Sequence, residues 1–398
     1  MQLEPSDRPP FQGGWIIALA YELGRVIEPV AVSEAKRMDA AWPWSVALWR
    51  GGSKLAYDHV AGMWWGEGRG CGKLLRELEE RCAGNAGDRE FRLDDLGTLG
   101  TREDYVAAVR RGVEYIHAGD CFQVNLAHRI GAGFSGSTRS LFREMLARAA
   151  PWYGAYLEMP GGPDLHAALS VSPELFLNFD ARTRLVTTRP IKGTRAGDVN
   201  PEELLRSGKD QAELNMIVDL MRNDLGRVCR VGTVRVVEER VIERHGAGVG
   251  VHHGVATVQG ELRAGLGAAD LLRATFPAGS ITGAPKVRAM QIIEELEPAA
   301  RGLYTGAIGY ISDCGDMCLN VVIRTAVVRG RRAASVRLDD IESGELVYGA
   351  GAGIVAESNP EREWQETLDK AGVLWGLGDG QQRVRGSARE QHKREVLA

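Results

Sequence analysis

The order of the predicted elements indicates an α+β fold with largely antiparallel sheets. Stretches of strand-like alternation follow one another in groups, around 165–194, 232–262 and 304–349, rather than alternating singly with helices. The glycine patterns of dinucleotide-binding folds and P-loops are absent from the sequence. These observations argue against a doubly wound parallel sheet and favour antiparallel pairing.

The first part of the chain is predicted to contain short strands and turns. Six of the nine tryptophans lie within residues 11–65, where we expect them to pack under irregular loops. The following segments are more regular. We predict helices at 71–83, 103–117 and 141–149, a linker at 84–88 and a strand within 119–130.

The second part is predicted to carry further helices, at 209–226, 268–274 and 285–296. A last helix is expected to open at Asn359-Pro360, because proline suits the first helical turn, and to close near Gly376. Residues 377–398 are rich in Gly, Arg and Gln and poor in apolar residues, so we expect a disordered tail.

Composition narrows the class of protein. The chain has 398 residues, 44% hydrophobic and 26% charged, as in globular proteins of one large or two ordinary domains. A net charge of −4 gives no reason to expect nucleic acid or an anionic membrane as partner. The six cysteines are scattered without metal-site or disulfide spacing, and no apolar run is long enough to span a bilayer. A cytoplasmic protein is therefore expected.

One carboxylate on the helix 209–226 is placed unusually. Glu213 projects from an apolar stripe whose members follow it by three, four, seven and eight positions, namely Met216, Ile217, Leu220 and Met221. A carboxylate buried there must be paired, metal-bound or protonated. The helix alone leaves a metal site and an Arg or Lys partner equally open.

Two further segments carry charged or glycine-rich patterns. Glu366 lies four residues before Lys370, which alone favours an exposed ion pair of little energy. The segment YGAGAGIV puts Gly349, Gly351 and Gly353 at the end of a predicted strand, where free amides can bind an anion.

Lys192 and two histidines are weaker candidates when each is taken alone. Lys192 ends a Thr-rich strand just before a glycine, and becomes a nucleophile only if burial or a second cation lowers its pKa. His252 and His253 are adjacent on a predicted strand, so their side chains point to opposite faces and cannot both serve one site.

Taken in order, these segments resemble the chorismate-utilising enzymes, which include anthranilate synthase, aminodeoxychorismate synthase, isochorismate synthase and salicylate synthase. The resemblance runs from residue 10 to about residue 375. It rests on GDCFQVNL, SPELF, RPIKGT, AELNMIVDLMRNDLG, PAGSITGAPKVRAM, IRTAV and GAGAGIVAES followed by QETLDKA. It implies a large sandwich of two antiparallel sheets flanked by helices. The implied division is an N-terminal remnant at 1–95, a chorismate-binding catalytic domain at 96–376 and the tail at 377–398.

The resemblance also implies roles for individual residues. Glu213 and Glu366 match the ligands of a Mg²⁺ ion that chorismate's carboxylate would share, which revises the interpretation of Glu366 as a plain surface residue. Glu174 matches a general acid or base beside the departing C4 hydroxyl, and His253 lies near the same hydroxyl. Positions that hold the substrate are matched by Ser280, Tyr304, Arg324, Gly351, Gly353 and Lys370.

Two positions distinguish the subfamilies. Gln123 stands where isochorismate and salicylate synthases have a water-activating lysine, so attack by water is disfavoured. Lys192, within PIKGT, stands where anthranilate synthases usually have alanine, and matches the lysine that attacks C2 in aminodeoxychorismate synthases. The expected reaction is amination of chorismate at C4. The alternatives are anthranilate synthase activity and a non-catalytic homologue.

The chain also departs from the family pattern. Ile17 replaces a glycine of the GGWxGxxxYE start, and Gly254 replaces the aliphatic residue that commonly follows the histidine. Relatives usually carry more strands upstream, where anthranilate synthases bind tryptophan. No glutaminase-like nucleophile elbow is present, so the expected nitrogen source is ammonia from a separate glutamine amidotransferase subunit.

Overall fold

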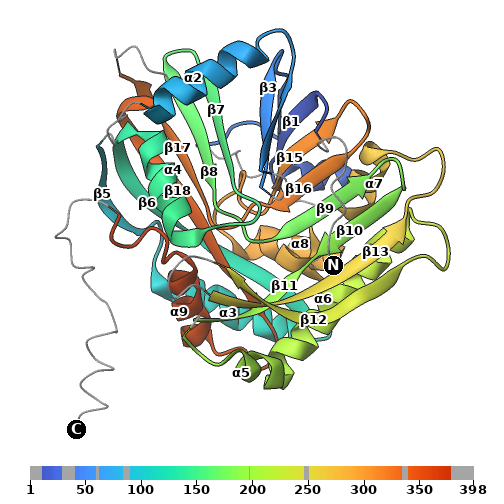
Figure 1. Cartoon of the computed structure of the whole chain (residues 1–398). Coiled ribbons are helices and arrows are strands. Elements are labelled where there is room, and N and C mark those ends of the chain that lie inside the picture. Colours follow the sequence, from blue (N-terminus) through green and yellow to red (C-terminus); the bar gives the residue numbers. More distant parts are fainter. Residues whose placement is uncertain are drawn as a thin grey trace.

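Two antiparallel sheets form the body of the protein (Figure 1). The structure is a computed structural model and describes residues 11–28, 41–59, 62–83, 90–196, 198–245, 251–333 and 339–377. In the view of Figure 1 the larger sheet lies to the right and the smaller sheet to the left, with helices below and around them.

The larger sheet collects strands from both ends of the chain. β1 (Gly14–Leu19) pairs with β15 (Ala307–Ser312) on one side and with β2 (Val46–Trp49) on the other. The order continues from β15 through β16 (Met317–Val321), β9 (Leu175–Asp180), β10 (Leu185–Arg189) and β13 (Val251–Glu261) to β11 (Ile191–Ala196). β12 (Arg235–His245) also pairs with β13.

The smaller sheet is built around two long neighbouring strands, β6 (Gln123–Ser137) and β18 (Asp340–Ile354). Its order is β14 (Gly283–Ala284), β6, β18, β17 (Thr325–Arg332), β8 (Asp164–Ser170) and β7 (Ala155–Gly161), with β5 (Phe91–Thr98) also on β6. A separate hairpin joins β3 (Lys54–Asp58) and β4 (Met63–Glu67).

Several helices begin at residues whose side chains cap them. Thr101, Ser137, Ser207 and Asn359 each accept a hydrogen bond from a backbone amide of the first turn. The helices they open are α3 (Arg102–His117), α4 (Thr138–Ala149), α6 (Gly208–Gly226) and α9 (Pro360–Lys370). The remaining helical elements are α1 (Leu23–Ile27), α2 (Cys71–Ala83), α5 (Pro201–Arg206), α7 (Ala268–Thr275), the short 3₁₀ turn η1 (Gly279–Ile281) and α8 (Lys286–Leu296).

The core has two main layers near the site. Ile217 and Met221 of α6 pack against the larger sheet, in one apolar cluster with Phe176. Between the sheets, a second cluster joins Ile308 of the larger sheet to Val327 of the smaller sheet. Because each layer buries apolar side chains from distant segments, the two sheets and α6 hold one another in place.

The predicted α+β class with antiparallel sheets is confirmed, and two local predictions need correction. The last helix ends at Lys370 rather than near Gly376, because turns after it bury Ala371, Leu374 and Leu377 against the smaller sheet. The strand predicted to end near residue 349 continues to Ile354 as β18, so the glycines of YGAGAGIV lie in its last part, as expected.

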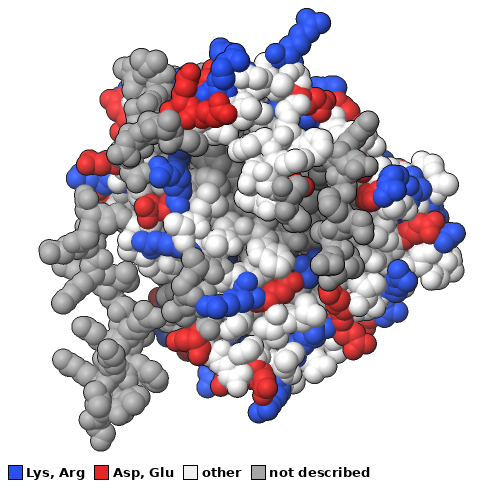
Figure 2. All heavy atoms as spheres, in the orientation of Figure 1, with Lys and Arg blue, Asp and Glu red and all other residues white. Residues whose placement is uncertain are grey.

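The structure neither confirms nor contradicts several predictions made from the sequence. The predicted linker at 84–88, and the predicted tail beyond Leu377, lie outside the described residues. The division at residue 95 stays a prediction. Among the helices described, none combines the length and apolarity needed to cross a membrane. On the face drawn in Figure 2, basic and acidic side chains of the described residues are interspersed, and neither sign gathers into a patch.

Candidate active site

A bulge in β11 directs Lys192 toward the site. Ile191 pairs with Val255 and Thr194 with His253, so that Lys192 and its neighbour stand opposite Gly254 alone. A Cβ at Gly254 would lie 2.6 Å from the carbonyl oxygen of Lys192. The glycine that departs from the family pattern is therefore what lets the bulge approach β13, and a bulge of this kind re-aims a side chain.

The amine of Lys192 is surrounded by charged groups from separate elements. Burial lowers its pKa, although the residue as a whole keeps some exposure to solvent. The second amine, Lys370, lowers that pKa further, whereas the carboxylates of Glu213, Glu174 and Glu366 raise it. The structure thus brings together five residues that the sequence assigned to the site.

Glu174 is an almost fully buried carboxyl between β8 and β9. Burial raises its pKa to about 7, against the opposing effects of a hydrogen bond from Ser280 and the charge of Lys192. Ser172 fixes the backbone here, because its hydroxyl accepts from the Glu174 amide at 3.2 Å. A carboxyl with this pKa can both give and take a proton near neutral pH.

Lys192 of the larger sheet meets Gln123 of the smaller sheet at Gly353. A Cβ built on Gly353 would lie 3.1 Å from both Lys192 Nζ and Gln123 Nε2. Gln123 is fully buried, and neither its amide nitrogen nor its amide oxygen has a hydrogen-bond partner among the residues that the structure describes. A side chain at Gly353 would occupy the space in which the two polar groups converge.

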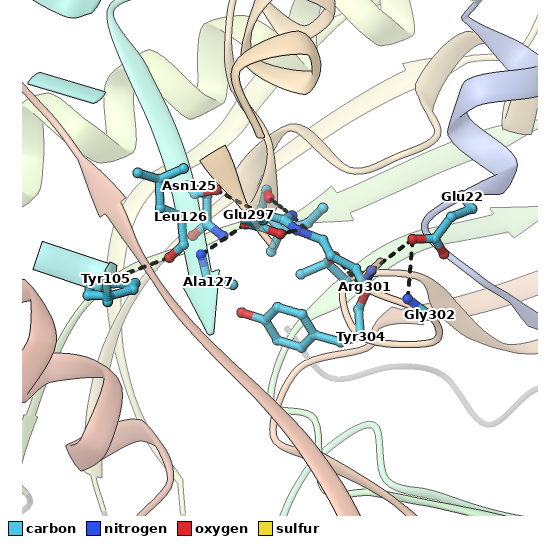
Figure 3. A network of polar contacts seen from close by, with 11 residues as sticks. Glu22, Tyr105, Asn125, Leu126, Ala127, Glu297, Arg301, Gly302 and Tyr304 are labelled. Carbon is cyan, nitrogen blue, oxygen red and sulfur yellow. Dashed lines mark hydrogen bonds and ion pairs between the residues drawn. The ribbon is translucent and has the colours of Figure 1, made fainter. Parts of the chain in front are cut away.

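The glycines of β18 turn their backbone amides away from β6. Gly353 stands opposite Asn125 and Gly351 opposite Ala127. The backbone amides of Asn125 and Ala127 point to the far side of β6. The Asn125 amide donates to Thr282 O at 2.8 Å, and the Ala127 amide donates to Glu297 Oε1 at 2.9 Å, as Figure 3 shows for the second bond. These are therefore non-hydrogen-bonded pairs, in which the glycine N–H and C=O groups also point outward.

The outward edge of β18 is open at these glycines. Along the described residues, β17 pairs with β18 from Ile341 to Tyr348 and no further. Beyond that point Lys370 of α9 donates to the carbonyl of Gly351 at 2.9 Å. Lys370 also forms an ion pair with Glu366 at 2.7 Å, as their helical spacing predicted. The open edge leaves backbone amides of Gly351 and Gly353 directed toward α9 and available to a ligand.

Tyr304 and Arg324 complete the predicted substrate contacts. A Cβ at Gly351 would lie 2.9 Å from the Tyr304 hydroxyl oxygen, so the tyrosine reaches β18 where the strand is bare; Figure 3 shows its hydroxyl directed toward β6. Burial raises the pKa of Tyr304 to about 12. Arg324 has a left-handed backbone at φ +50°, and burial lowers its pKa, while Glu174 acts on it in the opposite direction.

His253 is buried beside the bulge. Its Nδ1 lies 2.9 Å from the Thr194 hydroxyl, whereas its buried Nε2 has no hydrogen-bond partner in the described part of the chain. Burial lowers the pKa of His253 well below the usual value for histidine, so the ring is neutral at physiological pH.

Glu213 and Glu366 are suited to a hard cation. Within the described parts of the chain, no group of three or more His, Cys, Asp and Glu side chains forms a metal site. Magnesium is commonly held by one or two carboxylates together with substrate oxygens and water. Two carboxylates from α6 and α9, both acting on the pKa of Lys192, fit that requirement, and the metal stays a proposal.

Sequence reasoning missed the polar network behind the site (Figure 3). Buried Arg301 pairs with Glu297 at 2.6 Å and donates to Asn125 O at 2.7 Å and Ile281 O at 2.9 Å. It therefore ties β6 to the turn that carries Ser280. Asn125 was missed as well, although its position two residues after Gln123 places both side chains on one face of β6.

Comparison with known proteins gives a consistent picture. The family model for chorismate binding enzymes matches residues 2–376. The chain is 41% identical to aminodeoxychorismate synthase component 1 of Escherichia coli, over 91% of this chain and 76% of that protein. It is 43% identical to anthranilate synthase component 1 of Pseudomonas aeruginosa, over 69% of this chain and 53% of that protein.

A solved structure supports the fold as well. Anthranilate synthase component I from Streptococcus pneumoniae superposes with a TM-score of 0.76 at 28% identity, covering 93% of this chain and 82% of that one. The fold expected from the resemblance is therefore confirmed. From the matching family model and the long alignments, this chain belongs to the chorismate binding enzyme family.

Proposed function

We propose that the chain aminates chorismate at C4 with ammonia, forming 4-amino-4-deoxychorismate for 4-aminobenzoate and folate synthesis. The observation that carries this proposal is the bulge that sets the amine of Lys192 among carboxylates, with its pKa lowered by burial. The length of the match to relatives named aminodeoxychorismate synthase component 1 supports the same choice.

In the first step the neutral amine of Lys192 attacks C2 of chorismate. A C–N bond forms, the ring double bonds shift, and the C4–O bond breaks. Glu174 gives its proton to the departing hydroxide, so that water leaves, and the resulting Glu174 carboxylate then takes one proton from the new secondary ammonium. The lowered pKa of Lys192 makes the neutral amine accessible, and a pKa of about 7 leaves Glu174 partly protonated.

In the second step ammonia attacks C4 and the bond between C2 and the Lys192 nitrogen breaks. The double bonds shift back, and the lysine leaves as an amine after taking up a proton. Gln123 has no basic group, so it binds substrate without activating water for a competing attack. His253 stays neutral and keeps its contact with Thr194, so its Nε2 would be the ring atom that can form a hydrogen bond to the substrate.

Glu213 and Glu366 would hold Mg²⁺, whose charge would bind and orient a substrate carboxylate. Tyr304, Arg324 and the open amides of Gly351 and Gly353 would bind the remaining oxygens. Without a partner subunit, this chain would use free ammonia as its nitrogen source. A glutamine amidotransferase subunit is the proposed physiological partner, since the relatives are named as one component of a synthase.

Product identity tests the proposal. The purified chain is incubated with chorismate, ammonium and Mg²⁺, with and without added aminodeoxychorismate lyase, and products are separated chromatographically. We expect 4-aminobenzoate only when the lyase is present. Direct formation of fluorescent 2-aminobenzoate would instead establish anthranilate synthase activity. Lys192→Ala should lose the C4 product, whereas Lys73→Ala, on the exposed face of α2, is the matched control.

A further inference from the structure

Asn125 has a buried side-chain amide whose nitrogen makes no hydrogen bond of normal geometry with the residues that the structure describes. The residue is 6% exposed, and among the described residues its Nδ2 has no hydrogen-bond partner at normal geometry. Its backbone, by contrast, is fully used, since the amide donates to Thr282 O at 2.8 Å and the carbonyl accepts from Arg301 at 2.7 Å. Buried amides in folded proteins are normally paired, and leaving one unpaired costs about 1–3 kcal/mol.

The amide of Asn125 faces the candidate active site. Asn125 and Gln123 alternate with Val124 on β6, so their side chains share one face of the strand. Gly353 of β18 pairs directly with Asn125, so the place of its missing side chain, where Lys192 and Gln123 converge, is on the same face of the sheet. Two neighbouring amides with unpaired buried atoms, next to a residue without a side chain, indicate a surface prepared for a polar ligand.

Tyr304 locates the amide more closely. Burial raises the pKa of Tyr304, and a weak hydrogen-bonding interaction from the Asn125 side chain opposes that rise, so Nδ2 lies near the tyrosine hydroxyl although the two atoms lack the geometry of a normal hydrogen bond. Asn125 thus lies between the hydroxyl of Tyr304 and the convergence of Gln123 with Lys192. The free group at this point is a donor, and a donor requires an acceptor oxygen.

We propose that Asn125 is a further substrate-binding residue, whose Nδ2 donates a hydrogen bond to a carboxylate oxygen of chorismate beside Tyr304. The inference rests on chorismate being the substrate, as proposed above. Leaving this amide unpaired lowers the stability of the free protein, but it keeps the Nδ2 donor available to chorismate. Functional sites often reduce stability in this way.

Binding and stability measured together test this assignment. Asn125→Ala removes the amide without adding bulk, and Asn125→Leu keeps the volume. Chorismate affinity is measured by titration calorimetry with Mg²⁺ and without ammonia. Because a hydrogen bond to a charged group is lost, both variants should bind about tenfold to about a hundredfold more weakly. Asn178→Ala, on the exposed side of β9, should bind as the wild type does.

A second buried asparagine separates binding from folding. Asn320 is also buried, but its side chain is satisfied, donating to Tyr153 O at 2.8 Å and accepting from the Ile308 amide at 2.9 Å. Asn320→Ala should lower the urea midpoint clearly, whereas Asn125→Ala should lower it much less. Unchanged chorismate affinity, or a loss of stability equal to that of Asn320→Ala, would overturn the proposal.

Chorismate binding and product formation by the wild-type protein show whether a failure concerns the role of Asn125 or the proposed reaction. If it fails to bind chorismate, both are wrong. If it binds chorismate but gives no C4-aminated product, the proposed reaction alone is wrong, and the affinities of the Asn125 variants still decide the role of Asn125.

Discussion

Glu174→Gln should change how the stability of the free protein depends on pH. Burial raises the pKa of Glu174 from 4.5 to about 7, so the folded state holds this proton more tightly than the unfolded chain does. The associated stability is fully present below pH 4.5 and is lost as the pH rises through 7. Glutamine keeps the shape and cannot ionise, so the variant should not lose this contribution.

The size of the effect follows from the pKa shift. At about 1.4 kcal/mol per unit, the rise from 4.5 to about 7 corresponds to about 3 kcal/mol. Removing Glu174 also removes a carboxylate that favours the charged form of Lys192, which reduces the gain. We therefore expect the variant to gain between about 1 and about 3 kcal/mol relative to the wild type on going from pH 5 to pH 8.

Urea unfolding of both proteins at pH 5 and pH 8, without chorismate or Mg²⁺, measures this difference. Glu103→Gln is the control, because Glu103 is exposed on α3 and the same chemical change there should give no comparable trend. A free-energy difference between Glu174→Gln and wild type that is the same at both pH values would refute the argument. It would mean that Glu174 is not held as a buried acid.

Three further predictions address the bulge, the metal and the nitrogen source. Gly254→Val should reduce C4 amination at least about tenfold and lower the thermal midpoint of unfolding. The reason is that the new Cβ at position 254 would lie 2.6 Å from the Lys192 carbonyl oxygen. Activity like that of the wild type would show that the bulge is unimportant. Glu213→Gln should raise the Mg²⁺ concentration for half-maximal activity about tenfold or more without lowering the urea midpoint comparably, and an unchanged Mg²⁺ dependence would make Glu213 structural. The purified chain should use ammonia but not glutamine, and glutamine-dependent turnover without a second subunit would remove the case for a partner.

Local periodicity predicted the elements that depend on nearby residues. The helices at 103–117 and 209–226 lie within a residue of α3 and α6. The Glu366–Lys370 pair follows from helical spacing, and its ion pair is present at 2.7 Å. Such features need only the geometry of one helix, so a single stretch of sequence contains them.

The parts of the site that escaped prediction depend on register between distant segments. The bulge at Lys192 is defined by pairing with β13, about sixty residues later in the chain. The open edge of β18 depends on where β17 stops pairing and on which side of β6 Asn125 turns its backbone. Resemblance to a family pointed to Lys192 and the glycines, but it gave no reason to single out Asn125.

The central claim is that Lys192 attacks chorismate, and peptide mass spectrometry tests it most directly. The protein is mixed with chorismate and Mg²⁺ without ammonia, quenched, digested and analysed, with Lys192→Ala treated in parallel. We expect the peptide containing Lys192 to gain the mass of chorismate less one water, and the variant to gain nothing and to form almost no 4-amino-4-deoxychorismate when ammonia is added. An unmodified peptide, together with near-normal product from Lys192→Ala, would contradict the claim.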